Sequence, residues 1–205
     1  QCPVMHSDDS SLINPLNNVP LNLSQSPSPN QSKLLSTKRE TSTIPRVVAE
    51  SETKDSLQQN GANNWVYPSP QQFYSALMRK GHDMPEYQMA TMAQLHNFLN
   101  EEAWSEVLRW ERRYSSATSV PKLAEINGKP RELTYKARGL LWASWALPSY
   151  FQAQRPFDRH DWVITRSSGQ RLRYVIDYYK DDTDDEGNPA FVIDVRPASD
   201  SISSV

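Results

Sequence analysis

The chain has 205 residues, a formal net charge of −2 and a hydrophobic content of 37%, which allows one ordinary folded domain and an additional polar segment. Basic and acidic residues are interspersed, whereas nucleic-acid-binding proteins carry a clustered basic face, so no nucleic-acid partner is expected. The single cysteine, Cys2, excludes an internal disulfide and any metal site built from several cysteines. The longest apolar run, from Gly139 to Leu147, is too short for a membrane span.

The first 63 residues contain no tryptophan, tyrosine or phenylalanine and are rich in serine, asparagine, glutamine and proline. Because such a segment has too little apolar surface to offset its ordering entropy, we expect a disordered tail over 1–63 and a folded unit over 64–205. The tail begins with a Cys2-Pro3 dipeptide. Two interpretations of Cys2 stay open: an inert tail residue, or a thiolate that ligates ferric haem transiently.

The first expected helix begins after Ser69. Ser69 at the N-cap, Pro70 at the first helical position and Gln72 three residues after the cap form a capping-box pattern. Apolar residues recur along the helix at the spacing of one buried side. Gly81 is a natural end for this helix.

The stretch from Met89 to Trp110 has helical periodicity and is expected to form two consecutive helices, with Asn100 as the N-cap of the second. At about 100° per residue, four side chains of the first helix lie on one stripe: Met89, Met92, Ala93 and His96. His96 therefore lies on an otherwise apolar side. It is either a core histidine with satisfied hydrogen bonds or a neutral imidazole that ligates the metal of a flat, apolar ligand.

In the second half of the chain, residues 115–133 are expected to form a loop. A helix is expected from Thr134 to Ala146, ending before Pro148. From Trp162 the hydrophobic period changes from 3.6 to 2, which predicts strands over 162–166, 172–179 and 190–195. The expected fold class is α+β: several helices over 64–148 packed with a small antiparallel β-meander over 157–197, preceded by the tail.

The sequence FDRHDW at 157–162 concentrates two carboxylates, an arginine and a histidine. Arg159 and His160 either form ion pairs with Asp158 and Asp161 at the entrance to a strand, or take part in chemistry. Four further arginines either bind an anionic ligand or are ordinary strand charges: Arg166, Arg171, Arg173 and Arg196. The sequence contains no glycine-rich phosphate loop and no nucleophile elbow.

Six motifs occur in order along the chain: CPVMH with NPLNN, WVYPSPQQFY, HNFLNE, PFDRHDW, RYVIDYY and DVRPASDS. Together they resemble the mitochondrial cytochrome c haem lyase family, also called holocytochrome c synthases, and the tail motifs resemble the fungal forms. The resemblance covers nearly the whole chain. It implies an enzyme that joins the two vinyl groups of haem b to the two cysteines of the Cys-x-x-Cys-His segment of apocytochrome c as thioethers. It also implies a location in the mitochondrial intermembrane space, peripheral on the inner membrane.

The resemblance further implies roles for individual residues. The family's axial haem-iron ligand matches His96, which would thus be the metal ligand and a catalytic residue. Glu101 matches an acidic position that the family needs, and would orient His96 or the apocytochrome. Arg159 and Arg166 are expected as haem-propionate partners, whereas His160 is expected to be structural. The full set of expected haem-binding residues is His96, Trp65, Tyr67, Asn97, Trp104, Arg159, Arg166 and Cys2.

Two functions of other classes compete with haem attachment. A non-catalytic haem carrier of the intermembrane space would bind and deliver haem without forming thioethers. A structural adaptor for respiratory assembly would neither bind haem nor modify a cytochrome.

Overall fold

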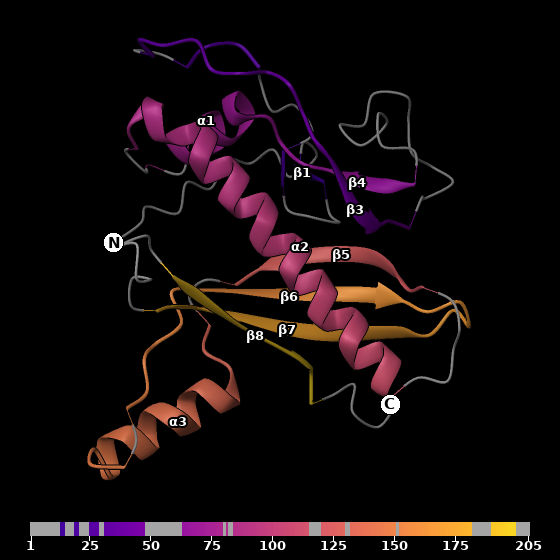
Figure 1. Cartoon of the computed structure of the whole chain (residues 1–205), viewed down its shortest axis with the longest axis vertical. Coiled ribbons are helices and arrows are strands. Elements are labelled where there is room, and N and C mark those ends of the chain that lie inside the picture. Colours follow the sequence, from indigo (N-terminus) through magenta and orange to yellow (C-terminus); the bar gives the residue numbers. More distant parts are fainter. Residues whose placement is uncertain are drawn as a thin grey trace. The chain divides into compact units, whose positions relative to one another are not determined.

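In the computed structural model of the protein, the chain divides into two compact units, Gln1–Trp104 and Ser105–Val205 (Figure 1). The structure describes residues 25–28, 31–47, 63–79, 81, 84–114, 120–129, 132–150, 152–181 and 190–199, together with the backbone of 13–14 and 19–20. Cys2 lies outside the described residues. The elements form an α+β fold, which confirms the expected fold class.

The first unit contains two short antiparallel ribbons. β1 (Ile13–Asn14) pairs with β2 (Val19–Pro20), and β3 (Thr41–Pro45) pairs with β4 (Asn64–Val66). In β3, buried side chains such as Ile44 alternate with exposed ones, and β-branched residues favour this extended conformation. The expectation of a tail without structure over 1–63 is therefore wrong for the part that contains these strands.

α1 (Pro70–Arg79) begins with the predicted capping box. Ser69 Oγ accepts the backbone N–H of Gln72 at 3.2 Å, and Gln72 Oε1 accepts the backbone N–H of Ser69 at 3.1 Å. Beyond the helix, Gly81 has φ 76°, a left-handed conformation in which glycine is favoured. The sequence prediction of this helix is confirmed at both ends.

α2 (Met89–Tyr114) is one continuous helix of 26 residues, preceded by a single 3₁₀ turn at Glu86–Gln88. The prediction of two helices is wrong because Asn100 does not act as a cap. Its side-chain Nδ2 instead donates to the backbone oxygen of His96 at 2.9 Å, one turn back inside the helix. The helix starts in the first unit and ends in the second.

The second unit is built on a four-stranded antiparallel sheet in the order β5-β6-β7-β8. Its strands are β5 (Lys122–Gly128), β6 (Asp158–Thr165), β7 (Arg171–Lys180) and β8 (Phe191–Pro197). The last three confirm the predicted meander.

β5 corrects the expectation of a loop over 115–133. Only Leu123 and Ala124 of this strand are well buried, and the register shifts between Leu123 and Glu125. That irregularity breaks the alternation that would have predicted a strand. The strand is held by its pairing with β6, which lies far away in the sequence.

The two sides of this sheet differ in chemistry. One side forms the core of the unit and carries the buried side chains Trp162, Ile164, Leu172, Tyr174, Ile176 and Val195. The end of α2 contacts this side, where Trp110 Nε1 donates to the backbone oxygen of Val195 at 2.7 Å. The other side is charged and carries Arg159, Asp161, Arg173, Asp177, Asp194 and Arg196.

α3 (Tyr135–Ala146) follows β5 and confirms the predicted helix. Its N-cap is Thr134, whose Oγ1 accepts the backbone N–H of Ala137 at 3.1 Å. In the described part of the chain, no helix combines the length and the apolar character needed to cross a bilayer.

Candidate functional site

The first unit contains six of the residues that the family resemblance assigns to the site: Trp65, Tyr67, His96, Asn97, Glu101 and Trp104. They lie on α2 and on β4 with the residue after it. Arg159 and Arg166 belong to the second unit.

The carboxylate of Glu101 accepts hydrogen bonds from three residues of the β3–β4 ribbon. Oε1 accepts the hydroxyl of Ser42 at 2.6 Å, the phenol of Tyr67 at 2.9 Å and the backbone N–H of Thr43 at 3.2 Å. Oε2 accepts the hydroxyl of Thr43. Burial by itself would raise the pKa of Glu101, but these hydrogen bonds outweigh it and hold the pKa below its ordinary value. Glu101 is therefore an anion at neutral pH.

Asn97, one turn before Glu101, makes a second connection between α2 and the segment that leads into β3. Its Nδ2 donates to Oε2 of Glu40 at 2.8 Å. The preceding residue, Arg39, donates to the backbone oxygens of Val66 and Tyr67, each at 3.1 Å. Polar contacts at Asn97 and Glu101 thus fix one side of the helix to the ribbon.

Tyr67 is half-buried beside Glu101. Burial raises the pKa of the Tyr67 phenol well above its ordinary value, and the negative charge of Glu101 adds to that effect. Tyr67 therefore stays protonated at physiological pH and acts as a hydrogen-bond donor to the carboxylate.

His96 lies half-buried on α2, and its ring lies 5.5 Å from the ring of Phe73 on α1, at an interplanar angle of 40°. Phe73 borders a small core cluster that includes Met89, with Met92 packed at its edge. The imidazole thus lies at the border of an apolar cluster, as the periodicity of the sequence indicates. Among the described residues, no group of three or more histidine, cysteine or acidic side chains could hold a metal ion.

Trp65 and Trp104 are core residues of the first unit, with exposed fractions of 6% and 3%. Each therefore exposes very little surface to solvent. Any contribution that they make to ligand binding therefore acts through packing of the residues around them.

Arg159 is buried and forms a two-pronged ion pair with Asp161. Its Nε donates to Oδ1 at 3.0 Å and its second terminal nitrogen donates to Oδ2 at 3.2 Å. His160 Nε2 lies 3.5 Å from Oδ2 of Asp158. The interpretation of FDRHDW as an ion-paired entrance to a strand is therefore confirmed.

Arg166 is also engaged inside the protein. Its Nε and a terminal nitrogen donate to the two carboxylate oxygens of Glu111 at 2.6 and 2.9 Å, and the phenol of Tyr174 donates to the same carboxylate at 2.6 Å. The hydrogen bonds to Glu111 raise the pKa of Arg166. Both arginines expected to bind propionates thus have internal carboxylate partners.

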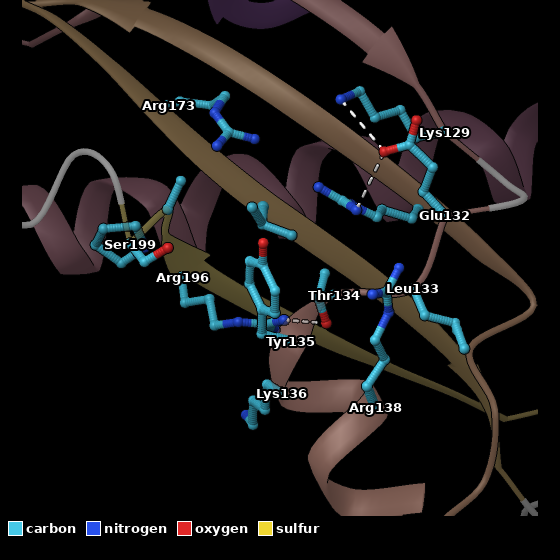
Figure 2. Close-up of a pocket in the computed structure, with 14 residues that line it drawn as sticks. Lys129, Glu132, Leu133, Thr134, Tyr135, Lys136, Arg138, Arg173, Arg196 and Ser199 are labelled. Atoms are coloured by element: carbon cyan, nitrogen blue, oxygen red, sulfur yellow. Dashed lines mark hydrogen bonds and ion pairs between the residues drawn. The ribbon is translucent and has the colours of Figure 1, made fainter.

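The charged side of the sheet borders a pocket of about 450 Å³ next to the start of α3 (Figure 2). Six cationic residues line it: Lys129, Lys136, Arg138, Arg159, Arg173 and Arg196. Of the further arginines, Arg173 and Arg196 line this pocket and pair with Asp161 and Asp177 respectively, and Arg171 pairs with Glu125 outside it.

Several residues around the predicted site were not identified from the sequence. Ser42 and Thr43 contact Glu101 across more than fifty positions of sequence. The only local signal is the β-branched run TSTIP inside an otherwise polar segment, which is typical of a strand. Phe73 is one of the recurring apolar residues of α1, but its contact with His96 has no sequence signal.

Comparison with known proteins identifies relatives along the whole chain. The family model described as cytochrome c/c1 heme lyase matches residues 3–205. No solved structure matches the chain.

The chain is 39% identical to the holocytochrome-c synthase of Saccharomyces cerevisiae, with all of this chain and 77% of the yeast protein covered. It is 37% identical to the human holocytochrome c-type synthase, with all of this chain and 71% of the human protein covered. A putative holocytochrome-c1 synthase of Schizosaccharomyces pombe is 39% identical over 80% of this chain and 69% of its own length. The chain belongs to the cytochrome c/c1 heme lyase family.

Proposed function

We propose that the protein attaches haem b to the Cys-x-x-Cys-His segment of apocytochrome c through two thioether bonds. The observation that supports this most is the family match from residue 3 to residue 205, together with relatives named holocytochrome-c synthase. Each attachment adds a cysteine thiol across a vinyl double bond: one carbon–sulfur bond forms and the thiol proton passes to the neighbouring vinyl carbon. Because the addition is redox-neutral, the main task of the enzyme is to position two thiols over two vinyl groups.

We propose His96 as the axial ligand that the protein supplies to the haem iron, with the histidine of the substrate segment as the second axial ligand. The contact between His96 and Phe73 supports this, because it places an imidazole at the edge of an apolar cluster on a long helix. Haem combines an apolar macrocycle with an iron that binds imidazole. A rigid ligand of this kind would fix the haem before the apocytochrome arrives.

Glu101 and Asn97 are proposed as positioning residues within the same site. Their contacts with Ser42, Thr43 and Glu40 hold the β3–β4 ribbon against the part of α2 that carries His96. Tyr67, half-buried on that ribbon, is the proposed haem or substrate contact of the set. Trp65 and Trp104 would support the site from the core, and Cys2 is proposed to assist haem capture.

Arg159 and Arg166, the two expected propionate partners, both form ion pairs inside the protein, and these pairs affect how their roles are interpreted. Arg166 donates to both carboxylate oxygens of Glu111, which favours a structural role for Arg166 over propionate binding. Arg159 is likewise held by two hydrogen bonds to Asp161, which favours a structural role for it as well.

We also propose a location in the mitochondrial intermembrane space, peripheral on the inner membrane. Support comes from the family, because cytochrome c matures in that compartment. The proposed partners are haem and apocytochrome c.

The proposal is tested by co-expressing the protein with apocytochrome c in a bacterial host that lacks its own attachment system. We expect covalent haem on the cytochrome and a Soret band on the purified enzyme. In His96→Gly both signals should fall strongly, and added imidazole should restore part of the Soret band by occupying the vacated position. His160→Asn is the matched control, because His160 pairs with Asp158 in the second unit and is not placed at the haem.

Two outcomes would contradict parts of the proposal. A Soret band without any covalent product, with folded enzyme and ample haem, would identify a haem carrier instead of a synthase. Unchanged haem occupancy in His96→Gly would exclude His96 as the iron ligand while leaving the attachment activity itself to be judged from the covalent product.

A further inference from the structure

α3 is attached to its unit almost entirely through its first turn. Within the helix only Ala137 is buried. Leu141 is half-buried, but most of the aromatic and apolar side chains that follow are open to solvent: Trp142 is 67% exposed, Trp145 80%, Leu147 52% and Tyr150 83%. A helix of this length is marginal in water without a packed apolar side, so another surface is expected to cover it.

The amino-acid composition of residues 133–157, which include α3, indicates what kind of surface covers the helix. From residue 133 to residue 157 the sequence contains no aspartate or glutamate, while it contains Lys136, Arg138 and Arg155. Tryptophan and tyrosine have an apolar body and one polar atom, which suits the boundary between lipid headgroups and acyl chains. Aromatic residues combined with cations and no acids suit the interface between water and an anionic lipid layer.

The pocket at the start of α3 has an excess of positive charge. Six cationic side chains line it, and the acidic residues that line it or pair with those cations are four: Glu132, Asp161, Asp177 and Asp194. Five of the six cations pair with one of these carboxylates, whereas Arg138 has no carboxylate partner among the described residues. Figure 2 shows Lys136 and Arg138 beside the first turn of α3, with Arg173 and Arg196 on the strands behind it.

We propose that α3 and this cationic pocket form the surface by which the protein binds a bilayer that contains anionic phospholipids. The side chains of Trp142 and Trp145 enter the interfacial layer, and the pocket receives lipid phosphate groups, for which guanidinium has matching geometry. The inference deepens the proposed peripheral membrane location by naming the residues responsible. It does not depend on the haem ligand.

The test measures co-flotation of the full-length protein with vesicles of phosphatidylcholine alone and of phosphatidylcholine mixed with phosphatidylglycerol. We expect binding mainly to the anionic vesicles. The double variant Trp142→Ser/Trp145→Ser should lose on the order of tenfold in vesicle affinity for each ring removed. Arg138→Gln should reduce affinity for the anionic vesicles by about fivefold and leave the weak binding to neutral vesicles unchanged.

A matched control removes exposed aromatic residues elsewhere: Tyr87→Ser/Phe98→Ser should bind vesicles as the parent does, since both side chains are exposed outside α3. Unchanged flotation of the α3 double variant would overturn the proposal. The proposal would also be overturned if the parent protein were a dimer and the α3 double variant a monomer that still binds vesicles. In that case α3 would be a subunit interface. Haem occupancy, measured on the same samples, should be equal in all variants of α3, which separates failure here from failure of the haem proposal.

Discussion

At the scale of single residues, Glu101 shows how the protein holds a partly buried charged group. Three residues of one ribbon donate to a single carboxylate, so the charge is compensated by hydrogen bonds without a cation among these contacts. The carboxylate lies on α2, five positions after His96. A change at Glu101 therefore affects both the anchoring of the ribbon and the setting of the proposed ligand.

Glu101→Gln should destabilise the first unit at neutral pH by about 1 kcal/mol, after allowance for the partial solvent exposure of this carboxylate. Because the pKa of Glu101 is lowered in the folded state, its stabilisation is complete above the ordinary value of 4.5 and is lost as the pH falls through the lowered value. The difference in free energy of unfolding between variant and parent should therefore shrink below pH 4.5. Urea unfolding followed across this range measures it.

Glu102→Gln provides the matched control for that measurement, because Glu102 is the exposed neighbour on the same helix. It should leave unfolding nearly unchanged across the same pH range. The free energy of unfolding that Glu101→Gln loses relative to the parent could instead stay constant as the solution is acidified. That result would show that the hydrogen bonds of Glu101 do not stabilise the fold through its charged form.

At the scale of secondary-structure elements, local chemistry predicted the helix start at Ser69, because its side chain bonds to a backbone group three residues away. Thr134 caps α3 in the same way, although the sequence predicted only that a helix begins there. The same logic failed at Asn100, whose amide bonds one turn back and leaves the helix unbroken. β5 was missed for a different reason: a register shift and pairing with β6 decide its conformation, and neither is encoded locally.

Thr134 offers a prediction for α3, since its hydroxyl serves three groups at once. Oγ1 accepts the N–H of Ala137 and a guanidinium N–H of Arg196 at 2.7 Å, and it donates to Oδ2 of Asp177 at 2.8 Å. Thr134→Ala should destabilise the second unit by about 2 kcal/mol, because a cap is lost and a fully buried carboxylate loses a donor. Hydrogen exchange should become faster in the first turns of α3. Thr134→Ser, which keeps the hydroxyl, should behave nearly as the parent.

At the scale of the whole molecule, composition and structure divide the chain differently. The absence of aromatic residues separates 1–63 from the rest, whereas the compact units meet between Trp104 and Ser105, inside α2. Composition detects where apolar residues are sparse, but it cannot detect that β3 pairs with β4 or that Ser42 bonds to Glu101. The motif around His96 located the candidate site, while its supporting residues come from a segment with almost no local signal.

The division into units leads to a prediction about their energetic coupling. The hydrogen bonds of Glu101 described above lie within the first unit, and the pair between Arg166 and Glu111 lies within the second. Arg166→Ala leaves a buried carboxylate without its main partner and should cost about 3–5 kcal/mol. If the units fold independently, the loss in free energy of unfolding of the double variant Glu101→Gln/Arg166→Ala should equal the sum of the losses of the two single variants, to within about 0.5 kcal/mol.

Site-resolved hydrogen exchange on the parent, the two single variants and the double variant measures this coupling. Glu101→Gln should speed exchange in β3 and β4, and Arg166→Ala should speed it in the strands of the second unit. Arg109→Ala is the control for Arg166, because Arg109 pairs with Glu106 at 2.9 Å on the surface and should cost less than about 1 kcal/mol. Losses in the double variant that exceed the sum, with faster exchange spreading from one unit to the other, would show instead that α2 couples the units into one cooperative fold.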